Sequence, residues 1–117
     1  MKYLCLIMVD EQKLAAISGE DAKILVDVSI DYANMLDERG QLLSTYALQS
    51  TQSATTIRLQ SGKVLVTDGP FAESNEQVGG YMLIEAADLN EAIAIAAKQP
   101  GAFLGGVEIR PVIEPGK

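Results

Sequence analysis

Two helix-start signals, at Ser18 and Asp88, restrict the fold of this chain more than any other feature. Ser18 offers a hydroxyl cap, and the acids after it suit the positive end of a helix dipole. Asp88 is followed three residues later by Glu91, which is the spacing of a capping box. The first helix is predicted to stop at Gly40, and the second before the Pro-Gly pair at residues 100–101.

The first of these helices carries two conflicting patterns. One is a strand-like alternation of β-branched residues, formed by Ile24, Val26, Val28 and Ile30. The other is an apolar face at helical spacing, formed by Leu25, Val28, Tyr32, Met35 and Leu36. The signals at both ends and the length of the segment favour a helix.

Strand-like segments surround the two helices, at residues 3–9, 42–49, 54–60, 63–67, 81–85 and 106–113. The apolar run 3–9 is typical of a central strand covered on both faces. Ser61-Gly62 is a two-residue hairpin signal. The order predicts one α+β domain over residues 1–117, a ferredoxin-like split βαβ sandwich with an inserted β-hairpin and helices on one face of an antiparallel sheet.

That arrangement leaves the second face of the sheet without a covering element. A small chain cannot hide an apolar sheet face by itself, so we expect a homodimer that associates through the sheet face.

Composition excludes several kinds of chemistry. The chain has no histidine and a single cysteine, Cys5, within an apolar run. The usual metal ligands, haem ligand and histidine-activated nucleophiles are therefore missing, and we expect no metal and no cofactor. A net charge of -7 argues against nucleic acid as a partner. The longest apolar run is too short to span a bilayer, and the start does not resemble a signal peptide, so we expect a cytoplasmic protein with no membrane partner.

The segment 66–81 is the candidate site, because it combines a sharp turn with carboxylates and a glycine pair. Asp68 has two interpretations. In an enclosed pocket it would serve as a general base or accept a hydrogen bond from a ligand. Alternatively, it shapes the Asp-Gly-Pro bend as an Asx turn.

Five further residues are candidate ligand contacts, each with a structural alternative. Arg58 and Arg110 suit bidentate contact with a small carboxylate, or are ordinary exposed strand residues. Glu76 contacts a ligand or anchors backbone amides near the glycine pair. Phe71 would be an apolar anchor beneath the loop. Tyr81 follows two glycines that allow close approach of a ligand, or is half-buried with its hydroxyl at the rim.

Four motifs in order carry a family likeness: M-K-Y-L-C-L-I at residues 1–7, V-T-D-G-P-F-A-E at 66–73, E-Q-V-G-G-Y at 76–81 and V-E-I-R-P-V at 107–112. Together they resemble the DGPF-domain proteins, a branch of the YCII-related family, over nearly the whole chain. The resemblance implies a ferredoxin-like domain that dimerises through its sheets as a dimeric α/β barrel. It also implies a regulatory link, since such proteins are often encoded beside sigma factors.

The sequence departs from the family in three ways. It has no histidine, so the His-Asp pair proposed as catalytic in the wider family cannot be carried over. Asn75 stands where a lysine is usual, and the stretch Ile24 to Ile30 is unusually β-branched for the family's first helix. Two function classes follow. The first is a small-ligand-binding or regulatory protein with a cleft beside the Asp68-Gly69-Pro70-Phe71 loop. The alternative is a cofactor-independent enzyme that uses Asp68 as a base on a small polar metabolite. The lack of histidine favours the first.

Overall fold

The computed structural model describes residues 1–115. Its strands are β1 (Lys2–Asp10), β2 (Leu42–Ala47), β3 (Thr55–Gln60), β4 (Lys63–Asp68), β5 (Glu76–Glu85) and β6 (Gly105–Pro111). Its α-helices are α1 (Glu11–Ala15), α2 (Gly19–Glu38) and α3 (Leu89–Ala97), and two short 3-10 helices lie at Thr51–Ser53 and Pro100–Leu104. Four strands form an antiparallel sheet in the order β2-β5-β1-β6, and β3 pairs with β4 separately. No helix within the described residues is long and apolar enough to cross a membrane.

The predicted fold class is confirmed: the chain is an α+β, ferredoxin-like split βαβ sandwich with an inserted hairpin. The helix-start signals act as expected. The Ser18 hydroxyl accepts a hydrogen bond from the Asp21 amide at 3.1 Å, and the Asp88 carboxylate accepts one from the Glu91 amide at 2.9 Å. Gly40 follows α2 at a φ of 70°, a left-handed backbone conformation that suits glycine. The conflict over the first helix is resolved in favour of helix.

Four local expectations were wrong. The strand expected over residues 81–85 begins five residues earlier, at Glu76. Residues 11–15, expected as a connector, form α1 because the Asp10 carboxylate accepts hydrogen bonds from the amides of Gln12 and Lys13. Val28 lies outside the buried stripe of α2 and is 42 % exposed. β1, expected to be covered on both faces, buries only alternate residues, since within the described chain α2 and α3 cover one face of the sheet.

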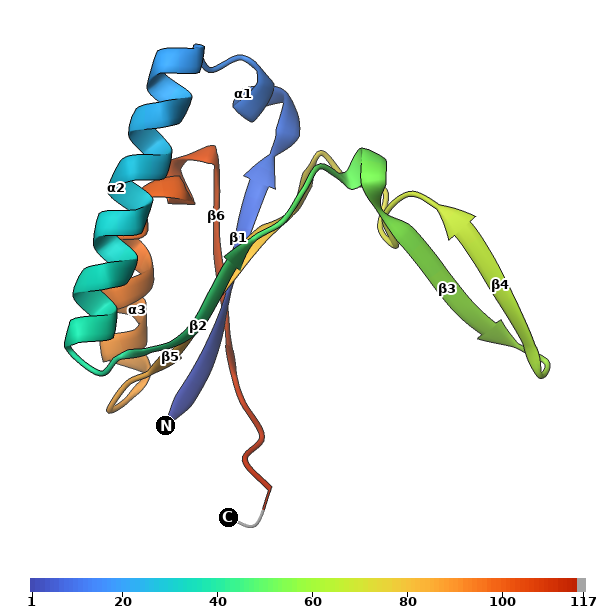
Figure 1. The fold of residues 1–117 in the computed structure, drawn as a ribbon. Coiled ribbons are helices and arrows are strands. Elements are labelled where there is room, and N and C mark those ends of the chain that lie inside the picture. The colour runs from blue at the N-terminus through green and yellow to red at the C-terminus, as the bar shows by residue number, and fades with distance from the viewer. Residues whose placement is uncertain (116–117) are drawn as a thin grey trace.

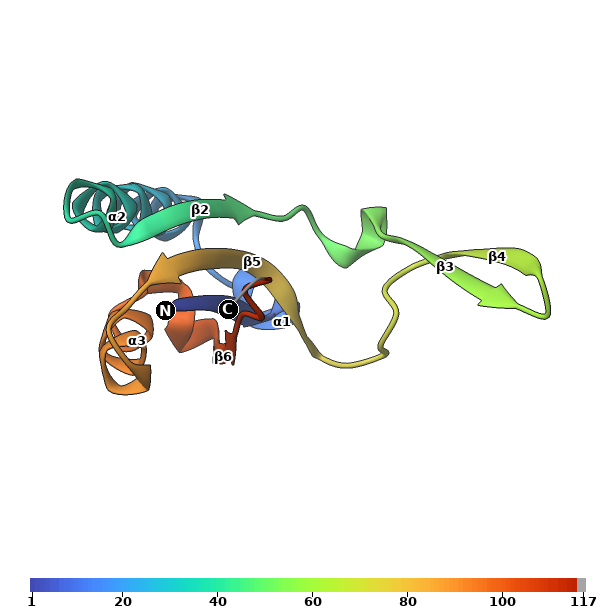
Figure 2. The same cartoon turned by 90° about the horizontal axis from the view of Figure 1, so that it is seen from below.

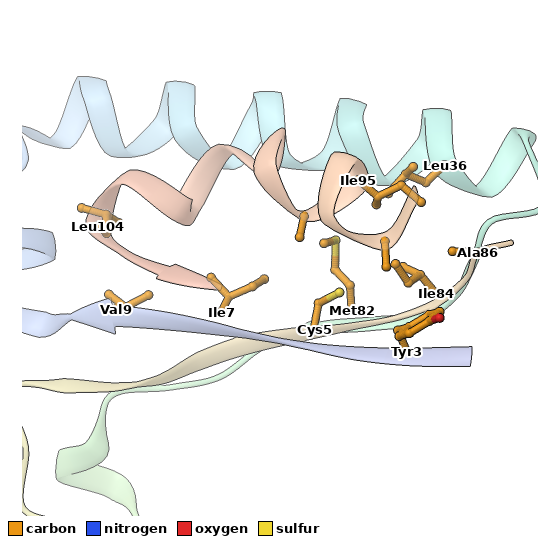
Figure 3. Close-up of a cluster of buried hydrophobic side chains, with 12 residues drawn as sticks. Tyr3, Cys5, Ile7, Val9, Leu36, Met82, Ile84, Ala86, Ile95 and Leu104 are labelled. Atoms are coloured by element: carbon orange, nitrogen blue, oxygen red, sulfur yellow. The ribbon is translucent and has the colours of Figure 1, made fainter. Parts of the chain in front are cut away.

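The core lies between that face and the helices (Figure 3). Its buried side chains are Tyr3, Cys5, Ile7, Val9, Leu36, Met82, Ile84, Ala86, Ala92, Ile95, Ala96 and Leu104. The Tyr32 hydroxyl joins the two helices by donating a hydrogen bond to the Ile95 carbonyl oxygen at 2.5 Å. Burial raises the pKa of the Cys5 thiol to about 11, as befits a cysteine that packs as a small apolar residue.

The opposite face of the sheet, called the open face here, carries the side chains that alternate with the core. They are Leu4, Leu6 and Met8 of β1, Tyr81 and Leu83 of β5, and Tyr46 of β2. In Figures 1 and 2, no other element of the described chain lies over this face.

The chain leaves the sheet between β2 and β5 to form an arm, residues 48–75, with the β3–β4 hairpin at its tip. The hairpin turns at Ser61 and Gly62, whose φ angles of 51° and 76° match the predicted two-residue turn. The arm projects away from α2 and α3, on the side of the open face (Figures 1 and 2).

Candidate functional site

The predicted site residues are distributed over three places. Arg58, Asp68 and Phe71 lie on the arm, Glu76 begins β5 at the junction of arm and sheet, and Tyr81 and Arg110 lie on the open face. None of them lines either of the two hollows of residues 1–115 that are described below. Their roles in ligand contact stay predictions.

Arg58 and Phe71 are brought together on the arm. The Arg58 guanidinium carbon lies 4.1 Å from the centroid of the Phe71 ring, within the range of a cation–π interaction. The segment after β4 therefore folds back onto the hairpin. Both side chains remain exposed to solvent.

Asp68 is separated from Arg58 by the pleat of the hairpin. It is the last residue of β4 and pairs with Thr55, whereas Arg58 pairs with Leu65, so alternation places the two side chains on opposite faces. Within residues 1–115, the exposed Asp68 carboxylate accepts no hydrogen bond. The bend after it is held by backbone and hydroxyl groups instead. The Gly69 amide donates to the Ala54 carbonyl at 2.8 Å, and the Thr56 hydroxyl donates to the Gly69 carbonyl at 2.7 Å.

Glu76 lies at the start of β5, where its amide donates to the Ser74 hydroxyl at 3.2 Å. Its side chain is not bonded to the amides of the glycine pair in the described chain. It extends instead toward Gly105, where a β-carbon would lie 2.9 Å from the Glu76 carboxylate and would overlap the Met8 carbonyl oxygen. This crowding explains why the strand β6 begins with glycine.

Tyr81 and Arg110 share the open face with β1 between them. The hydroxyls of Tyr81 and Ser44 lie 2.8 Å apart, and the ring centroids of Tyr81 and Tyr46 are 6.2 Å apart. Arg110 forms an exposed ion pair with Glu108 at 3.4 Å. Neither residue lines the two hollows of residues 1–115 described below, but both would contact anything that covers the sheet.

An open pocket of about 260 Å³ lies where the arm meets the sheet. It is lined by Val9, Glu11, Leu14, Ala15, Leu48, Gln49, Ser50, Gln77 and Gly79. None of residues 68–76 contributes to it, so this pocket is distinct from the cleft expected beside the Asp68–Phe71 loop.

Glu11 is the charged residue of this pocket, and its carboxylate is held in place. One oxygen accepts the Thr51 amide at 2.8 Å, and the other accepts the Thr51 hydroxyl at 2.8 Å and the Ser50 hydroxyl at 3.5 Å. The hydrogen bond from the Thr51 amide, followed by that from its hydroxyl, lowers the pKa of Glu11. The pocket therefore presents a fixed, ionised carboxylate. Sequence reasoning missed it because Glu11 and Thr51 are 40 residues apart and neither belongs to a motif.

The glycine pair of the E-Q-V-G-G-Y motif has a steric explanation. A β-carbon at Gly79 would lie 2.6 Å from a methyl carbon of Val9, and one at Gly80 would lie 2.9 Å from the Tyr46 carbonyl oxygen. Gly79 thus leaves room at the pocket wall, and Gly80 permits close approach of β2 to β5.

Two further features complete the description of residues 1–115. An apolar groove of about 290 Å³ lies between α3 and β6, lined by Ile93, Ala96, Ala97, Ala102, Val107 and Ile109. No cluster of three or more histidine, cysteine, aspartate or glutamate side chains in the described part of the chain is placed to hold a metal ion.

The sheet order and the helices on one face define a ferredoxin-like α+β protein with an arm inserted between two neighbouring strands. The sequence profile of the YCII-related domain matches residues 1–115. A relative, "Uncharacterized protein R00369" of Rhizobium meliloti (strain 1021), is 36% identical over 115 residues, which cover 96% of this chain and 92% of that protein. The chain belongs to the YCII-related family.

Proposed function

We propose that the protein binds a small ligand in the pocket beside Glu11 and acts as a homodimer. The observation that carries the proposal is the fixed carboxylate: the pocket combines apolar walls with one anionic group that hydrogen bonds from Thr51 and Ser50 keep in position. A few polar groups held in place in an otherwise apolar hollow are typical of small-molecule sites.

The chemistry of the lining suggests the kind of ligand. Val9, Leu14 and Leu48 supply apolar surface, and Gln49 and Gln77 supply amide groups that both donate and accept hydrogen bonds. The Glu11 carboxylate favours a cation or a hydrogen-bond donor. We therefore propose a ligand with an apolar body and an amino or hydroxyl group.

Binding is favoured over catalysis by the surroundings of Asp68. A carboxylate that serves as a general base near neutral pH needs an enclosed site that raises its pKa. Asp68 is exposed on the arm, and Arg58 lies on the opposite face of the hairpin. We therefore propose that the D-G-P-F segment, the motif of the DGPF branch, shapes the arm rather than performing a reaction.

The dimer rests on the open face, whose apolar side chains lack a cover in the described chain. An interface formed by two such faces should bury at least about 1,200 Å² in total. Sedimentation velocity at micromolar concentration should show a dimer, and a monomer alone would contradict this part of the proposal.

The ligand proposal is tested with two variants that separate charge from anchoring. Glu11→Gln keeps the shape of the side chain but removes its charge. Thr51→Val removes the hydroxyl that holds Glu11 but keeps the charge and the Thr51 backbone. Thermal melts should be recorded with a panel of primary amines and alcohols that carry an alkyl or aryl group, and with a matched panel of carboxylates.

We expect these amines or alcohols, but not the carboxylates, to raise the melting temperature of the wild type, and to raise that of Thr51→Val by less because Glu11 has lost one hydrogen bond. The same compounds should have no effect on Glu11→Gln. If Glu11→Gln responds as the wild type does, or if only carboxylates stabilise the protein, the pocket does not bind ligands through Glu11.

A further inference from the structure

The arm carries an apolar row, defined as Ile57, Leu59, Val64 and Val66. Ile57 pairs with Val66 and Leu59 pairs with Val64, so the pleat places all four side chains on one face of the hairpin. Their exposed fractions are 60%, 80%, 62% and 65%. Such a cluster on a solvated hairpin is unusual, because exposed apolar patches commonly mark interaction sites.

Thr51 ties the base of the arm to Glu11, but the hairpin at the tip of the arm is not paired with the main sheet. It projects from the sheet, and β3 and β4 pair with each other and with no strand of the main sheet. A two-stranded hairpin by itself is marginally stable in water and needs packing against another surface. The apolar row is the surface that would supply this packing.

The arm and the open face lie on the same side of the molecule. Figures 1 and 2 show the arm standing out from the sheet on the side away from α2 and α3, where the open face also lies. A partner molecule that covers the open face would therefore have the arm beside it.

The centre of the open face is uncharged, and this allows a second copy of this chain to be the partner. Leu4, Leu6, Tyr81 and Leu83 occupy that centre. Charged strand residues lie toward the ends of the face and on its β6 edge: Lys2, Glu85, Arg110, Glu108, Asp10 and Glu76. Much of the acid behind the net charge of -7 lies elsewhere, on α2, at Glu20, Asp21, Asp27, Asp31, Asp37 and Glu38. Two open faces can therefore meet over their apolar centres, away from the acidic surface of α2.

The reach of the arm also fits a second copy. A strand of six residues such as β3 spans about 20 Å at about 3.3 Å per residue, and stacked sheets are separated by about 10 Å. An arm of this length extends beyond the sheet of a partner that is stacked on the open face. It would then lie along the side of the partner.

We propose that the arm of each protomer clasps the other protomer, with the apolar row packed against the partner's surface. This inference rests on the proposed dimer and adds to it a second contact region, distant from the stacked sheets. In a symmetric dimer each protomer's arm packs against the other protomer, so the dimer contains two such contacts.

Two leucines on opposite faces of the hairpin give a matched test. Leu59 belongs to the apolar row and is 80% exposed, whereas Leu65 faces the other side and is 42% exposed. Because Leu65 is the less exposed of the two in the single chain, Leu65→Ser should lower the stability of the single chain more than Leu59→Ser does. The clasp predicts the reverse for association: Leu59→Ser should raise the dimer dissociation constant at least about tenfold more than Leu65→Ser, which corresponds to about 1.4 kcal/mol.

Sedimentation equilibrium of the wild type and both variants measures this difference. If the wild type is dimeric and Leu59→Ser weakens it no more than Leu65→Ser, the clasp is wrong while the dimer stands. If the wild type is monomeric at all accessible concentrations, the dimer and the clasp both fail. Ligand binding beside Glu11 would then be judged separately by the thermal melts.

A crosslinking measurement locates the arm directly. p-Benzoylphenylalanine in place of Leu59 should give covalent dimers of this chain after irradiation, identified by mass spectrometry of the joined peptides. The same group in place of Lys63, on the opposite face, should give several-fold fewer. Crosslinks from position 59 confined to its own chain would overturn the proposal.

Discussion

The body and the arm of this protein are built from strands with the same kind of alternation, but the alternation has different consequences. In β1, and in β5 from Gly80 to Ile84, every second residue is buried. In β3 and β4 all but one of the residues are exposed, although Ile57, Leu59, Val64 and Val66 alternate just as regularly. Alternation of apolar and polar residues therefore identifies a strand and its two faces, but it does not show whether the apolar face is covered within the same chain.

The largest expected contrast is between two leucines. Leu36 of α2 is 1% exposed, and its truncation in Leu36→Ala should lower the free energy of unfolding by about 2–5 kcal/mol, because it leaves a cavity in the core. Leu59→Ala, measured in the monomeric chain, should change it by less than about 0.5 kcal/mol. Urea unfolding at dilute concentration makes the comparison, and equal effects would show that the arm packs against its own body.

The next prediction concerns backbone crowding, which the body has and the arm lacks. Gly105→Ala should lower the free energy of unfolding by about 1–3 kcal/mol, since the added methyl group overlaps the Met8 carbonyl oxygen. Gly19→Ala is the control, because Gly19 has no atom within 4 Å of the added carbon. Thermal unfolding should show a lower midpoint for Gly105→Ala only, and an unchanged midpoint would mean that β6 shifts freely away from β1.

A smaller effect is expected from two tyrosine hydroxyls. Tyr32→Phe removes the hydrogen bond to the Ile95 carbonyl oxygen and should lower the free energy of unfolding by about 1 kcal/mol. Tyr46→Phe on the open face should be silent in the monomeric chain, because its hydroxyl makes no hydrogen bond within residues 1–115. Chemical denaturation of both variants compares a hydroxyl that joins α2 to α3 with one on the open face, and a silent Tyr32→Phe would contradict the role given to that hydroxyl.

The smallest effect concerns the attachment of the arm through Glu11. Because its folded pKa lies below the ordinary value of 4.5, the hydrogen bonds to Thr51 should be fully present above about pH 4.5 and weaken as the pH falls through the folded pKa. An NMR titration should show the Thr51 amide resonance moving at a midpoint below 4.5. Glu11→Gln should abolish that movement, and its persistence in the variant would assign the titration to another group.

The sequence predicted features that depend on local chemistry. The caps at Ser18 and Asp88 and the turn at Ser61-Gly62 involve residues two or three positions apart, so their patterns are visible along the chain. The order of these elements was then enough to predict the fold class. The pocket was not predictable in the same way, because it depends on a contact between Glu11 and Thr51 that only the folded chain creates. The direction of the hairpin relative to the sheet was also not predictable, because no sequence pattern indicates that β3 and β4 leave the sheet.

The place where the arm is inserted has a consequence for how such a protein can change. The arm leaves from β2 and returns to β5, and these two strands are antiparallel neighbours in the sheet. Its ends are therefore already adjacent, and the register of the body does not depend on the length of chain between them. Related chains can gain or lose hairpin residues while keeping the same core. The length of the arm and the stability of the core can thus change independently, because they depend on separate stretches of one chain.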